Sequence, residues 1–207
     1  MATATPVLST TSAITNLEDN ALQWGIFQDG GSATGTLANV KSPSIDGTAL
    51  KVSLVGGQPY VGIHAYRNLP AANMATTFEL NLYFSFTHES SIQALEFTVS
   101  KWMNNWRWEW ALQWEHLGDG GPQQGNPPTW RLWTGKSWHF LHLYGDISNG
   151  QVHYITFSCD GISANLSQMF DSVSSPGDKL AVAVQLDGDN HEDSYQMYID
   201  GVDLLWG

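Results

Sequence analysis

Residues 102–114 read WMNNWRWEWALQW, and bulky apolar side chains recur in this stretch with a period of two. As one continuous strand, it places on one face Trp102, Trp106, Trp108, Trp110, Leu112 and Trp114, and on the other Arg107, Glu109, Ala111, Gln113 and Glu115. A helical stripe of every fourth residue competes, but Trp108 falls outside it, aromatic residues favour strands, and a Gly- and Pro-containing loop follows at 118–122. The stretch therefore predicts strand structure with one aromatic and one polar face.

The rest of the chain has the same organisation of strands and turns. Residues 78–86, FELNLYFSF, alternate between apolar and polar side chains, which predicts a half-buried strand. Strand patterns recur about every 10 to 15 residues with turn signals between them, and no segment has the period of an amphipathic helix. The sequence thus predicts an all-β fold, an antiparallel two-sheet β-sandwich of the jelly-roll type. We expect a single domain over 14–207, preceded by a flexible Ser/Thr-rich leader over 1–13.

The charge balance restricts the partners of the chain. Its 20 acidic and 8 basic residues give a net charge of -12, so nucleic acid and anionic membranes would be repelled, and a neutral or cationic partner is expected. Cys159 is the only cysteine, so no intrachain disulfide can form. No apolar run has the length that crosses a membrane, and the first residues lack the pattern of a secretion signal, which leaves a cytoplasmic location open.

Six motifs carry a resemblance to a known group of domains. They are SPSIDG at 42–47, GGQPYVG at 56–62, ALEFTV at 94–99, WRLW at 130–133, KSWHFL at 136–141 and YQMYIDGVDLLW at 195–206. With them the chain resembles bacterial, mostly secreted β-sandwich domains related to the concanavalin A-like lectin and glucanase superfamily. The resemblance implies a carbohydrate ligand on the concave face of one sheet or in the loops at its edge, and a secreted or cell-surface location. The chain departs from the group by lacking a cysteine pair near 130–133 and by its tryptophan-dense stretch.

Aromatic rings next to planar polar side chains suit the recognition of a sugar. The C–H faces of a sugar ring stack on indole, and its hydroxyl groups bond to Glu, Gln and Arg. We expect a carbohydrate-binding module that recognises a neutral glycan through a tryptophan-rich groove. The predicted ligand-binding residues are Trp102, Trp106, Arg107, Trp108, Trp110, Gln113, Trp114, Trp130, Trp133, Tyr60 and Tyr83. If the tryptophans at 106, 108 and 110 instead fill the core between the sheets, the opposite face, with Arg107, Glu109, Gln113 and Glu115, becomes the ligand surface.

An enzyme on the same scaffold is the alternative function. It could be a glycan hydrolase or lyase, or a cyclase whose cationic intermediate the tryptophan cluster would stabilise. Its catalytic residues would be Glu96, Glu109 and Glu115, since neighbouring strands could bring two carboxyl groups to the separation of about 5 to 9.5 Å that glycosidases use. The sandwich glucanases that the chain resembles carry a fuller pattern, E-x-D-x-x-E, whereas here Thr98 follows Glu96. A lyase would draw its base and its neutralising group from Tyr60, His64, Arg67 and Tyr83.

The segment 187–193, DGDNHED, gathers oxygen ligands of the kind that calcium prefers. Sandwich domains of the resembling group often hold a structural calcium through a carboxylate near the last strand, here Asp200 or Asp203. The predicted metal ligands are Asp187, Asp189 and Asp200, with a solvated hairpin turn as the competing interpretation. The seven histidines show no metal-binding spacing, and His139 and His142 would point to opposite faces of a strand, so transition-metal catalysis is not expected.

Overall fold

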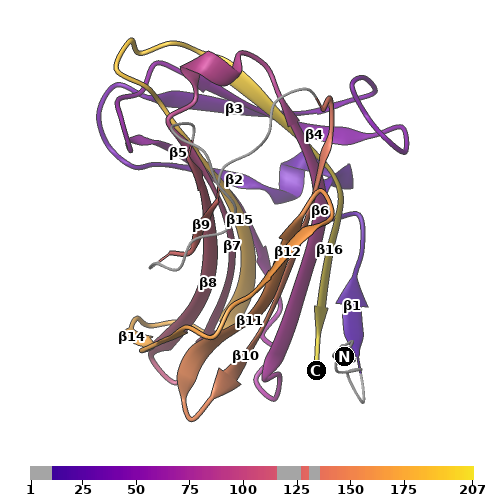
Figure 1. The fold of residues 1–207 in the computed structure, drawn as a ribbon, viewed down its shortest axis with the longest axis vertical. Helices are drawn as coiled ribbons and strands as arrows, with labels where there is room; N and C mark the ends of the chain where they lie inside the picture. Colours follow the sequence, from indigo (N-terminus) through magenta and orange to yellow (C-terminus); the bar gives the residue numbers. More distant parts are fainter. Residues whose placement is uncertain (1–10, 116–126, 131–135) are drawn as a thin grey trace.

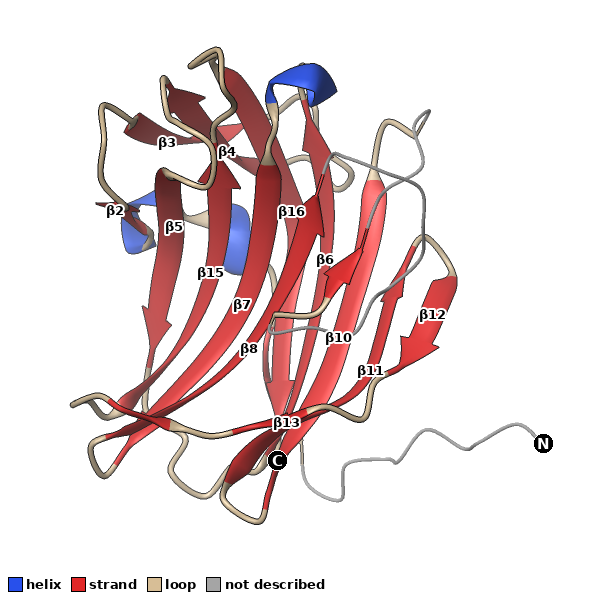
Figure 2. Ribbon diagram, turned by 60° about the vertical axis from the view of Figure 1, so that its left-hand side comes forward, coloured by secondary structure: helices blue, strands red, loops and turns tan. Residues whose placement is uncertain are grey.

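The computed structural model describes residues 11–115, 127–130 and 136–207. In these residues two sheets face each other across an apolar core (Figure 1). Three single-turn 3₁₀ segments, drawn in blue in Figure 2, are η1 (Leu17–Asp19), η2 (Ala21–Gln23) and η3 (Glu89–Ser91). Among the described residues no helix has the length and apolar character needed to cross a membrane. The predicted all-β, two-sheet antiparallel sandwich is confirmed.

The first sheet runs in the order β12-β11-β10-β6-β16-β4-β3, with β1 beside β16 and β13 beside β11. Its strands are β1 (Ser12–Ile14), β3 (Thr34–Val40), β4 (Ala49–Val55), β6 (Thr77–Phe86), β10 (His139–Ser148), β11 (Gln151–Cys159), β12 (Ile162–Asn165), β13 (Met169–Phe170) and β16 (Tyr195–Trp206). Ser12 pairs with Trp206 and Ala13 with Leu205. This part of the predicted leader therefore belongs to the sheet.

The second sheet runs in the order β14-β8-β7-β15-β5-β2, and β9 pairs in parallel with β8. Its strands are β2 (Gly25–Gln28), β5 (Gly62–Leu69), β7 (Ala94–Met103), β8 (Trp106–Glu115), β9 (Thr129–Trp130), β14 (Val173–Ser174) and β15 (Lys179–Asp187). The stretch 102–114 thus contains the end of β7, a turn and most of β8, where the sequence was read as one strand. β7 and β8 pair along their whole length.

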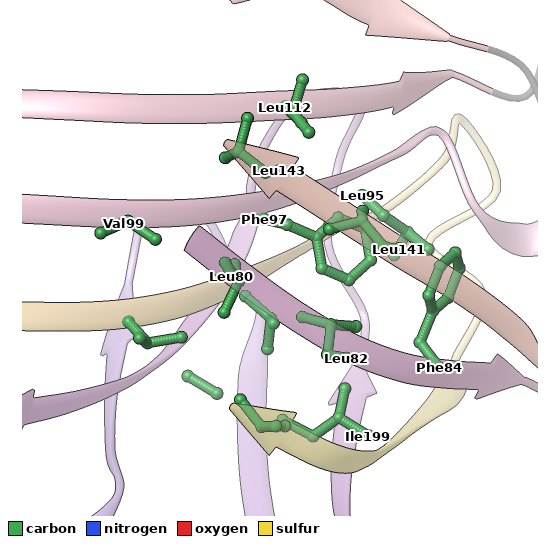
Figure 3. Close-up of a cluster of buried hydrophobic side chains, with 14 of the residues drawn as sticks. Leu80, Leu82, Phe84, Leu95, Phe97, Val99, Leu112, Leu141, Leu143 and Ile199 are labelled. Atoms are coloured by element: carbon green, nitrogen blue, oxygen red, sulfur yellow. The ribbon is translucent and has the colours of Figure 1, made fainter. Parts of the chain in front are cut away.

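The core lies between the inner faces of the two sheets. The alternation predicted for 78–86 holds: Phe78, Leu80, Leu82 and Phe84 of β6 are buried. Figure 3 shows side chains of β6 meeting side chains of β7 from the other sheet, and the ring centres of Phe84 and Phe97 are 4.8 Å apart. Burying a side chain of this size contributes about 1.5–3 kcal/mol, so contact between the sheets is a main source of stability.

The second sheet is curved, and its hollow side faces away from the first sheet (Figure 1). On its central strand β15, Val182 and Val184 point into the core. Ala181 and Ala183 alternate with these valines, so they point to the hollow side, and each carries only a methyl group. These small side chains leave space on the hollow face of the second sheet.

Candidate functional site

The tryptophans of β8 lie largely in the core. Trp108, Trp110 and Trp114 are 8%, 1% and 1% exposed, and Trp130 of β9 is 2% exposed. The indole N–H groups of Trp108 and Trp110 donate to backbone carbonyl oxygens of the β10–β11 hairpin, at 2.8 and 3.2 Å. The sequence left open whether these rings line a groove or fill the core, and the structure shows that they fill the core. They present no face on which a sugar could stack, which removes them from the predicted ligand surface and leaves the cyclase hypothesis without an exposed cluster.

A turn places Trp102 on the opposite face from these rings. Asn104 and Asn105 have φ angles of 54° and 64°, as the central residues of a two-residue hairpin turn require. Trp102 consequently pairs with Arg107, and paired residues point to the same side of a sheet. Grouping Trp102 with Trp106 and the other β8 rings was wrong, because the turn resets the alternation. Trp106 itself is 46% exposed at the start of β8.

The hollow outer face of the second sheet holds a groove with a volume of about 550 Å³. We call it the sheet groove. Its lining comes from five strands and consists of Ile26, Phe27, His64, Tyr66, Asn68, Glu96, Thr98, Ser100, Trp102, Arg107, Glu109, Lys179, Ala181 and Ala183. Small side chains of β15 and β7 form its floor, and larger ones stand on either side. The volume lies in the range of about 300–1,000 Å³ that is typical of small-molecule sites.

Aromatic side chains border the sheet groove on the side of β2 and β5. Phe27 is 57% exposed, and its ring centre lies 5.7 Å from that of His64. Tyr66 lies against Gly25, where an added Cβ atom would come within 2.7 Å of the tyrosine ring, so the glycine is what lets the ring reach this position. Sequence reasoning did not name Phe27 and Tyr66, which line the groove. The alternation of His64, Tyr66 and Asn68 in one strand was the signal that could have found part of this border.

Trp102 borders the groove on the other side, between two cations. Lys179 Nζ lies 4.6 Å and Arg107 Cζ 5.9 Å from the centre of its ring. Arg107 also forms an ion pair with Glu109 at 3.3 Å, and Ser100 Oγ donates to the same carboxylate at 2.9 Å. The polar face of β8 thus faces the groove. The sequence predicted this arrangement for the case in which the tryptophans fill the core. The basic groups here are already engaged by neighbouring side chains.

Three carboxylates on the same face of the second sheet are held by neutral donors. Each receives a hydrogen bond from a side chain two residues away on its own strand: Thr98 Oγ1 donates to Glu96 at 3.2 Å, Gln113 Nε2 to Glu115 at 3.1 Å, and Gln185 Nε2 to Asp187 at 2.8 Å. Glu96 pairs with Gln113 on β8 and with Gln185 on β15. An amide–carboxylate–amide row therefore crosses three strands at the end of the groove.

Burial and neighbouring charges raise the pKa values of two carboxyl groups at this end of the groove. Burial, followed by the negative charge of Glu109, raises the pKa of Glu96 to about 7; Asp187 and Asp29 act in the same direction, and the bond from Thr98 opposes them. Burial also raises the pKa of Asp187 to about 6, against the opposing bond from Gln185. Near neutral pH the sheet groove therefore contains a carboxyl group that changes charge.

Two of the predicted catalytic carboxylates face the sheet groove together. Glu96 lies opposite Gln113 and Glu109 lies opposite Ser100, which is an offset of four residues, about 13 Å along the strand. Glu115 lies opposite Ala94, beyond the residues that line the groove. The structure thus joins Glu96 with Glu109 in one groove and leaves Glu115 at its edge.

Other predicted residues lie elsewhere. Tyr60 is in the turn before β5, and Tyr83 faces solvent from β6 on the first sheet. Arg67 donates to a backbone carbonyl of η1. Of the four residues named for a lyase, His64 alone lines the sheet groove, so the structure does not assemble that set. Trp133 lies outside the described residues.

A separate acidic cluster lies where η1 meets β16. Carboxylate oxygens of Glu18, Asp46 and Asp200 all lie within 4.8 Å of one another, and Glu18 and Asp200 are 0% and 1% exposed. The Glu18 carboxylate accepts from the backbone N–H groups of Gly201 and Val202, at 2.8 and 2.9 Å. Burial is the main cause that raises the pKa of Glu18 to about 7. Three carboxyl groups are thus gathered, two of them buried.

One oxygen of Asp200 has no partner among the described residues. Its Oδ2 accepts from Ser44 Oγ at 2.9 Å and from the Ile45 N–H at 2.6 Å, whereas the buried Oδ1 accepts no hydrogen bond. A buried acceptor without a donor is rare and indicates a missing partner. Oxygen atoms from three carboxylates around it suit a hard cation such as Ca²⁺. The residues present therefore fit a calcium ion.

The three metal ligands expected from the sequence do not come together. Asp200 belongs to the cluster just described, but Asp187 points to the hollow face of the second sheet, bonded by Gln185. Asp189 accepts hydrogen bonds from the backbone N–H groups of His191 and Asp193, as expected of a solvated turn. Sequence reasoning missed Glu18 and Asp46, since no local spacing connects them with a residue near the opposite end of the chain.

Comparison with known proteins adds information on the fold. No family model and no curated protein match the sequence. Among solved structures, the family 11 carbohydrate-binding module of the cellulosomal cellulase Lic26A-Cel5E of Clostridium thermocellum matches with a TM-score of 0.50 and 13% identity, covering 95% of each chain. The chain shares the fold of a carbohydrate-binding module. The cellulose induced protein Cip1 also matches, with a TM-score of 0.53, 11% identity and coverage of 92% of this chain and 96% of that one.

An enzyme is also among the similar structures. The alginate lyase Aly36B, in complex with alginate trisaccharide, has a TM-score of 0.47 and 15% identity, with 93% of this chain and 97% of that chain covered. At such identities the likeness concerns the fold alone. The two structures with TM-scores of 0.50 and 0.53 confirm the resemblance to β-sandwich domains that the sequence motifs indicated.

Proposed function

We propose that the protein is a carbohydrate-binding module that holds a neutral glycan in the sheet groove. The observation that carries this proposal is the lining of the groove. A floor of small side chains lies between an exposed aromatic border on β2 and β5 and polar groups on β7 and β8. A sugar ring needs this combination, an apolar platform beside hydrogen-bonding groups.

Each part of the lining has a task in this proposal. Phe27 and Tyr66 offer rings for the C–H faces of the sugar, while Glu96 and Glu109 accept hydrogen bonds from its hydroxyl groups. The small side chain of Ala181 lets the glycan lie close to the sheet. Of the tryptophans in the described residues, Trp102 lines the groove, so the aromatic contribution is mixed rather than rich in tryptophan.

The fold supports the same class of function. The solved structure with a TM-score of 0.50 is a carbohydrate-binding module by name, and its sandwich is covered almost completely by this chain. The resembling domains are mostly secreted, and we extend to this protein a secreted or cell-surface location, where polysaccharides occur.

Calorimetry with soluble glucans, xylans and mannans tests the proposed function. Phe27→Ala and Tyr66→Ala should each weaken binding of the recognised glycan about tenfold, because each removes an aromatic platform. Tyr83→Ala is the matched control, since it removes an exposed ring from the other sheet and should leave binding unchanged. The proposal fails if no neutral glycan binds, or if binding is insensitive to both groove variants.

A glycan hydrolase is a second candidate, favoured by the carboxyl group of Glu96 in the groove, although the offset of about 13 Å to Glu109 along the sheet exceeds the separation of about 5 to 9.5 Å that glycosidases use. With its pKa raised to about 7, Glu96 would keep its proton near neutral pH and could act as a general acid. Release of reducing ends from the same glycans distinguishes the two functions. In an enzyme, Glu96→Gln would reduce turnover by orders of magnitude, whereas in a binding module it would weaken affinity modestly.

We also propose that Glu18, Asp46 and Asp200 hold a structural Ca²⁺. The free Oδ1 of Asp200 and the shared negative charge of the buried cluster support this assignment. An ion at this position would connect η1, the segment 44–46 and β16. Its contribution would be to the stability of the sandwich, because the cluster belongs to η1 and β16 and the sheet groove to the outer face of the second sheet.

A further inference from the structure

The two ends of the sheet groove differ in charge. At one end, Lys179 and Arg107 lie beside Trp102. At the other end are Glu96 and, next to it on the same face, Asp187. Trp102 lies six positions after Glu96 on β7, about 20 Å along the strand. A ligand lying along the groove therefore meets basic groups at one end and acidic groups at the other.

The acidic end has no basic partner in the described residues. Arg107 is paired with Glu109 at 3.3 Å, Lys179 lies over the Trp102 ring, and His64 Nε2 lies 3.7 Å from Asp29. Neither Glu96 nor Asp187 forms an ion pair with a described residue, and the hydrogen bonds that hold them come from the neutral side chains of Thr98 and Gln185. Each carboxylate keeps further acceptor positions, since an ionised carboxylate offers about four.

The electrostatics of the groove favour a positive charge at this end. The carboxylates of Glu109, Asp187 and Asp29 raise the pKa of Glu96, in addition to its burial. Their joint effect is a negative potential above Glu96; the charge of His64 acts against it by lowering the pKa of Asp187, but burial dominates and keeps that pKa raised at about 6. A ligand ammonium group would be attracted there, and its three N–H donors match the open acceptor positions.

We propose that the sheet groove binds glycans that carry free amino groups more tightly than the uncharged glycan of the same backbone, with the ammonium group placed over Glu96. This preference rests on the proposed function and names the ligand class of the same site. The sugar ring at this position would contact the small floor formed by Thr98 and Ala183, where the sheet leaves room for it. The basic end beside Trp102 repels the amine, which determines the direction in which the glycan lies along the groove.

Isothermal titration calorimetry with three tetrasaccharides of the same β-1,4 backbone tests the preference. They are the tetramer of glucose and two forms of it in which one terminal residue is glucosamine or N-acetylglucosamine, called here the glucose, glucosamine and N-acetylglucosamine tetramers. At pH 7, near the pKa of about 7 of Glu96, an ammonium group over the carboxyl favours its ionised form, and we expect the glucosamine tetramer to bind about tenfold more tightly than the glucose tetramer. The N-acetylglucosamine tetramer, which has no charge, should show no such gain.

Two variants locate the effect. Glu96→Gln keeps the shape and a hydrogen-bonding amide, so it should abolish the gain from the amine and weaken binding of the uncharged tetramer only modestly. Glu79→Gln removes a carboxylate from the first sheet, where His142 lies 3.3 Å away, and should leave the gain unchanged. If Glu79→Gln reduces the gain as much as Glu96→Gln does, the attraction is to the net charge of the chain, and the preference is overturned.

Other outcomes separate this preference from the proposed function. Equal affinity for the glucose and glucosamine tetramers would overturn the preference and leave the function intact. A tetramer of glucuronic acid that binds best would also overturn it, because the basic end would then select the ligand. Failure of every tetramer and of the neutral polysaccharides would remove the proposed function as well.

Discussion

Trp102 faces Arg107 across the β7–β8 hairpin, with the guanidinium carbon 5.9 Å from the centre of the indole ring. The relationship depends on the turn at Asn104 and Asn105, which reverses the alternation of side chains between the two strands. It decides which part of this tryptophan-dense hairpin fills the core and which part borders the sheet groove.

The turn itself can be tested by substitution. Asparagine tolerates the left-handed conformation better than most residues, so Asn104→Ala and Asn105→Ala should each lower the free energy of unfolding by about 1 kcal/mol. Asn105→Gly should match or exceed the wild type, because glycine adopts this conformation without strain. Urea denaturation gives the three values. Wild-type stability in both alanine variants would contradict the role of the turn.

Gly145 should tolerate no side chain. Its position faces Trp110, and an added Cβ atom would lie 2.4 Å from the indole Nε1 and 2.7 Å from the His153 carbonyl oxygen. Gly145→Ala should therefore lower the unfolding free energy by about 1–3 kcal/mol. Combining it with Trp110→Phe should give a loss smaller than the sum of the two single losses, since the shortened ring relieves the clash. Strict additivity in thermal unfolding would argue against this contact.

Glu96 should make stability depend on pH with a defined sign. Its pKa is raised to about 7 when folded, from an ordinary value near 4.5. Between these values the unfolded chain has released the proton and the folded chain has kept it, so stability falls as pH rises through this window. Glu96→Gln removes the effect, and its advantage over the wild type should be absent near pH 4 and largest above about pH 7.

Glu79 gives the opposite sign and serves as the control for the pH series. The hydrogen bond to His142 is the main cause that lowers the pKa of Glu79, so its contribution is present above the ordinary carboxyl pKa and is lost as pH falls. Glu79→Gln should thus be slightly less stable than the wild type at neutral pH and equal to it in acid. Urea titrations from pH 4 to pH 8 in the presence of a chelator measure both series. A constant difference between wild type and Glu96→Gln would contradict the assignment.

Calcium should raise the melting temperature. Saturation to a hundred times the dissociation constant adds about 2.7 kcal/mol, which corresponds to about 5–10 °C for a domain of this size. Chelation should reverse the shift, and Asp200→Asn should abolish it by removing a ligand charge from the buried cluster. Asp189→Asn alters the other acidic group, the turn at 189–193, and should retain the full shift. An equal response in the Asp200 variant would place the ion elsewhere.

Local patterns were sufficient for the strands and for the sandwich. The alternation over 78–86 predicted β6 correctly, because one face of this strand is buried and the other is not. The facing of Trp102 could not be obtained in the same way. Two asparagines turn the chain between Trp102 and Trp106, and without the turn the period of two groups both rings on one side.

The site required contacts that no local pattern contains. Phe27, Tyr66 and Lys179 belong to three strands that meet only in the folded sheet. Glu18 comes beside Asp200 because its carboxylate accepts hydrogen bonds from the backbone N–H groups of Gly201 and Val202, far away in the sequence. The sequence did predict that Glu96 and Glu109 point to the same face, because polar alternation along each strand is a local property.

The two alanines of β15 have a practical consequence for redesign. Ala181 and Ala183 set the depth of the hollow, while Val182 and Val184 on the reverse side anchor the same strand. Replacing these alanines with Ser, Val or Leu would raise the floor of the sheet groove in graded steps, and the side chains on the buried face of β15 would stay the same. The loss of affinity along such a series would show how thick a glycan chain the proposed binding surface can accommodate.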